Sequence, residues 1–187
     1  MYTFHLHDDV TWHDGEPFSA EDVKFTFDMI VEHDGPAGFN LSDMKEVRVE
    51  DDTTVVIELE NPNAAFLGYL AWYGTFIVAE HVYDDSNWDS GTTIEPIGTG
   101  PFVFDEHTSG VSINLLANEE YFGHVPEVPS LVFSITADQD TKMQAFYNGE
   151  IDILGTAPPS SEIASLEENE DYVIERRVWP SREYIFF

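Results

Sequence analysis

Cysteine is absent from this chain of 187 residues, and basic residues are scarce. Without cysteine the chain can form no disulfide framework, no thiolate metal site and no cysteine nucleophile. Lys and Arg together number 7 against 37 Asp and Glu, which gives a formal net charge of −30. Because such a chain repels phosphate groups, its charge disfavours binding to nucleic acid and docking on an anionic membrane.

Long apolar runs are also missing. No stretch of about 18 apolar residues occurs, so no transmembrane helix is expected, and no signal-peptide pattern opens the chain. An apolar fraction of 42% and an aromatic fraction of 14% nevertheless predict a folded core. Both ends of the chain fall within strand-like segments, which predicts a piece of a longer protein.

The acidic residues are spread along the chain in short groups, such as Asp8 with Asp9 and Glu167 with Glu168. At low ionic strength, self-repulsion of this size destabilises a compact state. In molar salt the Debye length is roughly 3 Å, so the repulsion is screened. The composition therefore predicts a halophilic protein, of the kind made by a halophilic archaeon. This prediction concerns the solvent and leaves the ligand open.

Hydrophobic periodicity predicts a mixed α/β chain. Ser19, with Asp22 three residues later, forms a capping-box pattern that opens a helix. Further helices are expected from Asn61, from Asp138 or Asp140, and from Ser160 or Ser161. Predicted strands cover residues 2–7, 47–49, 55–59, 76–79, 102–104, 111–116, 131–136, 151–154 and 172–178. The strand–helix–strand order over residues 131–154 predicts a parallel strand pair.

Few residues point to catalysis. His5, His7 and His13 are close enough in sequence to suggest a metal site, but without a clear ligand pair we interpret them as solvent-facing. The chain contains no HExxH, no phosphate-binding loop and no GxSxG. Carboxylates are so abundant that no pair stands out as acid and base. We therefore predict no catalytic residue, no cofactor, no resident metal and no enzymatic activity.

Aromatic residues are more informative. Trp72 and Tyr73 close a predicted helix, and Tyr121 and Phe122 lie in a predicted loop. Such residues either pack against a neighbouring lobe or form the apolar wall of a site for a small organic ligand. The sequence leaves both interpretations open for the first pair and favours packing for the second.

Several segments in one order carry a family resemblance. They are YTFHL at 2–6, VTWHDG at 10–15, PFSAEDV at 17–23, IGTGPF at 97–102, NEEYF at 118–122 and residues 136–153. Together they resemble the motifs of ABC-transporter solute-binding proteins of family 5, the dipeptide, oligopeptide and nickel class. The resemblance covers essentially the whole chain.

This resemblance implies an α/β fold of the periplasmic-binding-protein type, in the class with an extra small domain. Residues 1–92 would form the small domain, and residues 93–178 would form part of the first lobe. Residues 179–187 would start the crossover to a second lobe, which is missing from this chain. Members of the family close two lobes on a ligand by a hinge.

The resemblance also implies a function: the substrate-capture component of an ABC importer, without catalysis. It would bind a peptide or similar small organic solute in the cleft between lobes and deliver it to the permease subunits. Its location would be extracellular, at the cell surface, through a lipid or membrane anchor outside this chain. By resemblance, Trp72, Tyr73, Gly74 and Thr75 match the region that lines the cleft, and Phe39 is a further candidate.

Two alternatives stay open at this point. The first is a nickel or metal-complex binding protein of the same family, which would use His5, His7 or His13. Some nickel-binding relatives place an arginine near residues 72–75, and this chain has none there. The second alternative is a secreted hydrolase that uses two carboxylates with separated pKa values.

Overall fold

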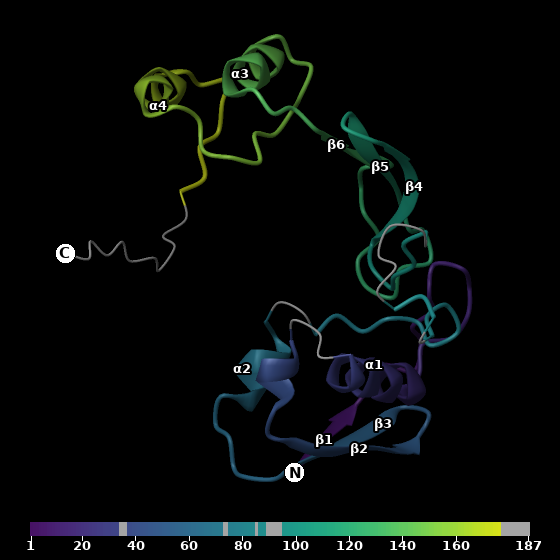
Figure 1. Ribbon diagram of the computed structural model, residues 1–187. Coiled ribbons are helices and arrows are strands. Elements are labelled where there is room, and N and C mark those ends of the chain that lie inside the picture. The colour runs from purple at the N-terminus through teal and green to yellow at the C-terminus, as the bar shows by residue number, and fades with distance from the viewer. Residues whose placement is uncertain (34–36, 73–74, 85, 89–94, 177–187) are drawn as a thin grey trace, which may run out of the picture. The chain divides into compact units, whose positions relative to one another are not determined.

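A computed structural model describes residues 1–33, 37–72, 75–84, 86–88 and 95–176 of the chain (Figure 1). Residues 1–133 form one compact unit and residues 134–187 form a second. Tyr73, Gly74 and the predicted crossover at 179–187 lie outside the described residues. Both predicted domain boundaries also lie there, so the division into residues 1–92 and 93–178 stays a prediction.

The first sheet of unit 1 has three antiparallel strands in the order β1-β3-β2. β1 is Tyr2–His5, β2 is Met44–Asp51 and β3 is Thr54–Leu59. The strand predicted at 2–7 is confirmed over residues 2–5, and the strands predicted at 47–49 and 55–59 are confirmed within β2 and β3. The central strand β3 is the most buried of the three, since Val55, Val56 and Ile57 are almost inaccessible to solvent. Val47 of β2 and Val55 and Ile57 of β3 belong to the core cluster, so the face of the sheet that carries them is turned toward the rest of the unit.

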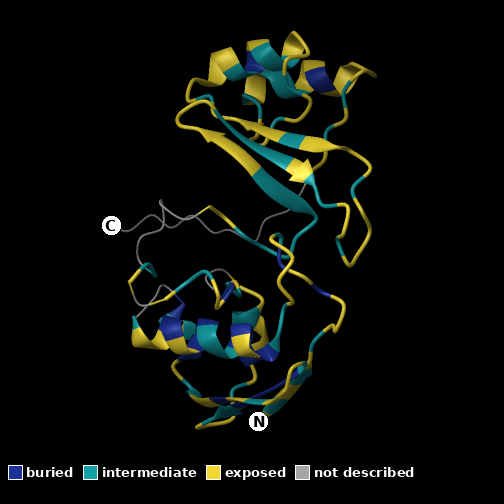
Figure 2. Ribbon diagram, turned by 90° about the vertical axis from the view of Figure 1, so that its right-hand side faces the viewer, coloured by how far each residue is buried: buried dark blue, intermediate teal, exposed yellow. Residues whose placement is uncertain are grey.

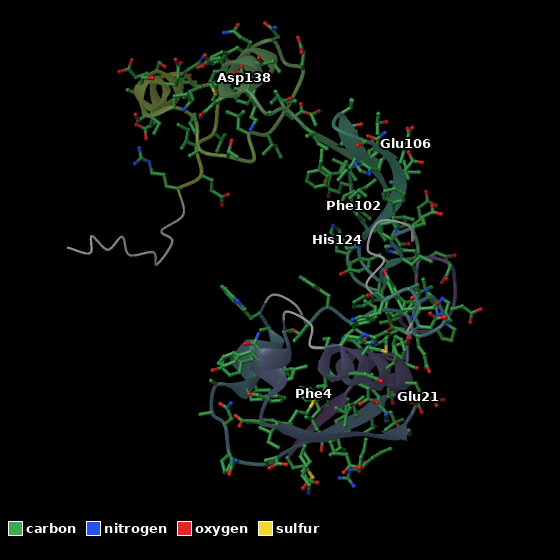
Figure 3. All side chains as sticks on the ribbon, in the orientation of Figure 1. Phe4, Glu21, Phe102, Glu106, His124 and Asp138 are labelled. Atoms are coloured by element: carbon green, nitrogen blue, oxygen red, sulfur yellow. The ribbon has the colours of Figure 1, made fainter. Side chains whose placement is uncertain are left out.

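Helix α1, Ala20–Glu32, packs against β2 and β3 of this sheet (Figure 1). Ser19 is its N-cap, and Ser19 and Asp22 form the predicted capping box. The buried face of α1 includes Val23, Phe27 and Ile30, and the buried residues of unit 1 gather on this helix and the sheet (Figure 2). Phe4 of β1 packs against the same core (Figure 3).

Two short elements complete this core. They are the 3-10 turn η1, Gly38–Leu41, and helix α2, Phe66–Leu70, which contact each other. Each supplies one deeply buried side chain, Leu41 from η1 and Phe66 from α2. Since Phe66 also lies with its ring centroid 5.3 Å from that of Tyr2, α2 is fixed to the edge strand β1.

The predicted strand at 76–79 is wrong. The structure assigns no strand there, because side chains of α1 satisfy the backbone of this segment in place of a neighbouring strand. The Thr26 hydroxyl accepts a hydrogen bond from the Val78 N–H at 3.0 Å, and a carboxylate oxygen of Asp22 accepts one from the Glu80 N–H at 2.9 Å. The apolar run thus packs on the helix in an extended form without joining a sheet.

A second sheet contains β4, Phe102–Thr108, β5, Ser112–Ala117, and β6, Ser130–Ser134, in that order. β4 and β5 are antiparallel and meet at a turn where Gly110 has a φ of 72°, a conformation that favours glycine. This agrees with the predicted hairpin.

Unit 2 contains α3, Gln139–Tyr147, and α4, Ser160–Glu168. Asp138 caps α3 by accepting a hydrogen bond from the Thr141 N–H at 2.8 Å, which confirms one of the two predicted helix starts. Residues 151–154 and 172–176 are not strands, so the predicted parallel pair is wrong. An alternating apolar pattern is not enough to form a strand, because the backbone N–H and C=O groups also need a neighbouring strand as hydrogen-bond partner. Among the described residues, no such strand pairs with these two segments.

The buried carboxylate of Asp22 accepts hydrogen bonds from the backbone N–H groups of Ser19 and Glu80 and from the Trp12 indole N–H. Replacing Asp22 with alanine is expected to destabilise unit 1 by about 3 kcal/mol, because these three donors would lose their acceptor. Glu21→Ala is the matched control, since Glu21 lies in the same first turn but points outward (Figure 3). The measurement is chemical denaturation in molar salt. Equal destabilisation by the two variants would contradict this account, since both remove an acid from the helix N-terminus.

Candidate functional site

A shallow groove of about 490 Å³ opens between η1 and α2 in unit 1. Within the part of the chain that the structure describes, no charged residue lines it; the lining residues are Asn40, Ala64, Ala65, Gly68, Tyr69 and Trp72. Its polar groups are the Asn40 amide and the Tyr69 hydroxyl. An apolar surface with a small number of polar groups is the usual composition of a site for a small organic ligand.

The spacing of residues on α2 explains why the groove forms. Residues 65, 68, 69 and 72 follow the i, i+3, i+4, i+7 pattern of one helical face. Phe66 and Leu70 lie on a neighbouring face of the helix and pack into the core. Burial of Phe66 therefore leaves the face with Gly68 and Trp72 exposed to solvent.

The start of α2 is held by Asn63. Its side-chain oxygen accepts a hydrogen bond from the Ala65 N–H at 2.9 Å, while its side-chain NH₂ donates to Asp43 at 2.7 Å. Its backbone carbonyl accepts a hydrogen bond from the Tyr2 hydroxyl at 3.1 Å. The groove is thus built on a helix that is bonded both to β1 and to the segment preceding β2.

The predicted site residues have different places in the structure. Trp72 lines the groove and is 63% exposed, and Phe39, in η1 beside Asn40, is 81% exposed. Thr75 is buried, and its hydroxyl lies 2.9 Å from the Leu70 carbonyl and 3.1 Å from that of Trp72, where it terminates the α2 segment. Tyr73 and Gly74 lie outside the described residues. The ligand-binding role of all five residues stays a prediction.

Sequence reasoning missed Asn40, Ala64, Ala65, Gly68 and Tyr69. One sequence pattern could have indicated most of them. Ala65, Gly68 and Tyr69 are spaced so that they share one helical face with Trp72, beside the face that Phe66 buries. Taken one at a time, alanine and glycine carry no chemical signal. Their contribution to the groove is the space that they leave.

Away from the groove, His13 joins the segment at 10–15 to the turn at 98–101. The Gly98 N–H donates to its Nδ1 at 3.2 Å, so Nε2 carries the ring hydrogen and donates to the Gly100 carbonyl at 3.0 Å. The side-chain NH₂ of Asn118 donates to the same carbonyl at 3.1 Å. Three of the resembling segments therefore contact one another and have a structural role.

Asp14, next to His13, forms a second link. Its carboxylate lies 2.7 Å from Nε2 of His81, and this hydrogen bond lowers the pKa of Asp14 below its usual value. A carboxyl with a lowered folded-state pKa contributes stability above its unfolded pKa and loses that contribution as the pH falls through the folded value. Because both side chains are about one third exposed, the gain is small.

The three histidines considered for metal binding have separate surroundings. His5 contacts the Thr54 hydroxyl, His7 stacks near Phe122, and both ring nitrogens of His13 are bonded to the glycine turn. Among the described residues, no group of three or more His, Asp or Glu could hold a metal ion. In that part of the chain, the geometry required by the metal hypothesis is therefore not met.

Comparison with known proteins identifies the family. A family model described as the bacterial extracellular solute-binding proteins, family 5 Middle, matches residues 1–187. The chain belongs to this family. It is 31% identical to the dipeptide-binding protein of Escherichia coli (strain K12) over 191 residues, which cover 90% of this chain and 35% of that protein.

Solved structures agree with this membership in family 5. NikZ from Campylobacter jejuni in complex with Ni(L-His) matches with a TM-score of 0.80 and 30% identity, over 90% of this chain and 34% of NikZ. DppA from Helicobacter pylori in complex with the peptide STSA matches with a TM-score of 0.77 and 28% identity, over 90% and 37%. The predicted fold class, part of a periplasmic-binding-protein-like α/β fold, is confirmed. The chain spans about a third of the length of these relatives.

His13→Phe is expected to release the turn at 98–101, since phenylalanine keeps the ring but offers no acceptor to the Gly98 N–H and no donor to the Gly100 carbonyl. The measurement is amide hydrogen exchange in molar salt, in which the Gly98 amide should lose its protection. His107→Phe, at an exposed position of β4, is the control and should leave Gly98 unchanged. Retained protection of Gly98 in His13→Phe would show that the ring does not hold the turn.

Proposed function

We propose that the complete protein is the substrate-capture component of an ABC importer, which binds a peptide or a similar small organic solute and delivers it to the permease subunits. The observation that carries this proposal is the uncharged groove with the exposed Trp72 in its wall, on a chain of family 5. The E. coli relative is named as a dipeptide-binding protein, and the H. pylori relative holds a peptide.

The chemistry of the groove suits such a ligand. The Asn40 amide and the Tyr69 hydroxyl can donate and accept hydrogen bonds, as the backbone of a peptide requires. The Trp72 indole offers an aromatic face that binds apolar side chains with little loss of conformational entropy. The described lining residues include no carboxylate, so an acid–base pair for hydrolysis has no support there. A binding role without catalysis follows as our proposal for the whole protein.

A metal complex is the second candidate, because NikZ is a family 5 structure with Ni(L-His) bound. A nickel complex would need neutral imidazoles or carboxylates that converge on one point. The described residues of this chain contain no such group. We therefore place peptide capture first.

Membership in family 5 supports a proposal for the location and the partners. We propose an extracellular protein at the cell surface, held there by a lipid or membrane anchor outside residues 1–187 and engaged with the permease subunits of its transporter. Among the described residues, no helix has both the length and the apolar character needed to cross a bilayer.

Trp72→Ala is expected to weaken peptide binding by the complete protein about tenfold or more, because it removes the aromatic wall of the groove. Trp72→Phe is the matched variant and should keep most of the affinity. Thermal shift in molar salt measures both, with dipeptides and a nickel–histidine complex as separate ligands. Stabilisation by the nickel complex alone would overturn peptide capture, and unchanged peptide affinity in Trp72→Ala would remove the groove from the binding site.

We also propose that the protein works in concentrated salt, as the net charge of −30 suggests. Dilution from molar salt to tens of millimolar should unfold it, because the Debye length grows from roughly 3 Å toward 30 Å and the carboxylates repel one another. The near-UV circular dichroism should then be lost and should return when salt is restored. An unchanged spectrum at low salt would contradict halophilic adaptation.

A further inference from the structure

Gly68 occupies a position at which the described fold does not require glycine. It lies within α2, where glycine costs roughly 0.5–1 kcal/mol relative to alanine. Its φ is not in the left-handed region, and among the described residues a Cβ atom built on it would meet no atom within 4 Å apart from its chain neighbours and the backbone of its own helix. Neither backbone conformation nor close packing therefore explains why this residue has no side chain.

The space beside Gly68 belongs to the groove. Gly68 lines it together with Ala64, Ala65 and Trp72. A side chain at a helical position leans back toward residues i−3 and i−4, which are Ala65 and Ala64 here. Any larger residue at position 68 would thus cover the small-residue floor of the groove. The absence of a side chain keeps that floor accessible beside the Trp72 indole.

The lining selects the kind of group that can enter. The lining residues that the structure describes carry no charge, so a charged side chain would lose its hydration there without gaining a partner. A flat apolar ring, in contrast, can lie against alanine and glycine and stack on the exposed tryptophan.

We propose that Gly68 is a specificity-determining residue, which opens the groove to the aromatic side chain of a peptide ligand. This inference rests on the proposed function, since it identifies the peptides that the protein would prefer. It predicts that peptides containing phenylalanine bind more tightly than those containing only alanine, and that peptides containing aspartate bind most weakly.

The test compares Gly68→Leu with wild type in the complete protein, by calorimetric titration in molar salt. The probes are the dipeptides Ala-Phe, Phe-Ala, Ala-Ala and Ala-Asp. Wild type should bind the better of the two phenylalanine peptides about tenfold or more tightly than Ala-Ala. Gly68→Leu should lose this preference while its affinity for Ala-Ala stays within about threefold of wild type. Its melting temperature should not fall, because leucine favours a helix more than glycine.

Gly155→Leu is the matched control, since a Cβ atom at Gly155 also meets nothing within 4 Å and Gly155 is not among the described residues that line the groove. It should leave all four affinities unchanged. Three results would each overturn this inference and leave peptide capture standing. They are an equal loss of affinity for Ala-Phe and Ala-Ala in Gly68→Leu, the same loss of affinity in Gly155→Leu, and no preference for phenylalanine in wild type. Failure of wild type to bind any of the peptides would overturn the proposed function as well.

Discussion

The carboxylate of Asp22 is the contact on which the arrangement of unit 1 depends. It accepts hydrogen bonds from the Ser19 N–H at 2.8 Å, the Trp12 indole at 3.3 Å and the Glu80 N–H at 2.9 Å. One buried side chain therefore caps α1, fixes the segment before it and binds the chain that follows α2. The segment after α2 also contains Thr75, whose hydroxyl bonds to the end of the α2 segment. The contact between Asp22 and this segment therefore helps to position the groove.

The residues that identify the family and the residues that form the groove are different sets. His13, Gly98, Gly100 and Asn118 carry the resemblance, and they use their polar groups on one another. The groove is made of alanine, glycine, asparagine and two aromatic residues. The motifs that identify the family in this chain indicate the structural framework, because tight turns require particular residues. A binding surface needs a shape, which many residues can provide.

The same distinction explains which predictions succeeded. The capping box at Ser19, the hairpin between β2 and β3 and the helix start at Asp138 are local, and the residues that specify them lie within a few positions of one another. The segments 76–79 and 151–154 have strand-like composition, but a strand exists only where another strand satisfies its backbone. For residues 76–79 the partners are side chains about 50 residues away, which no local pattern reveals. Trp72 was predicted for the site from its aromatic character and the family resemblance, and its ligand-binding role stays a prediction. Gly68 could be assigned to the groove only once the structure showed which face of α2 is buried.

The salt concentration determines how far the net charge of the protein can influence which ligand binds in the groove. In dilute solution a chain of −30 would attract cationic peptides over distances of tens of ångströms, and this long-range field would dominate the choice of ligand. In the concentrated salt that we propose, that field ends within roughly 3 Å of each carboxylate. Selection must then come from contacts that salt does not screen, such as shape, stacking and the exclusion of charge from an uncharged surface. A neutral groove on a strongly acidic protein is therefore consistent with both proposals, because salt removes the long-range selection that the charges would otherwise impose.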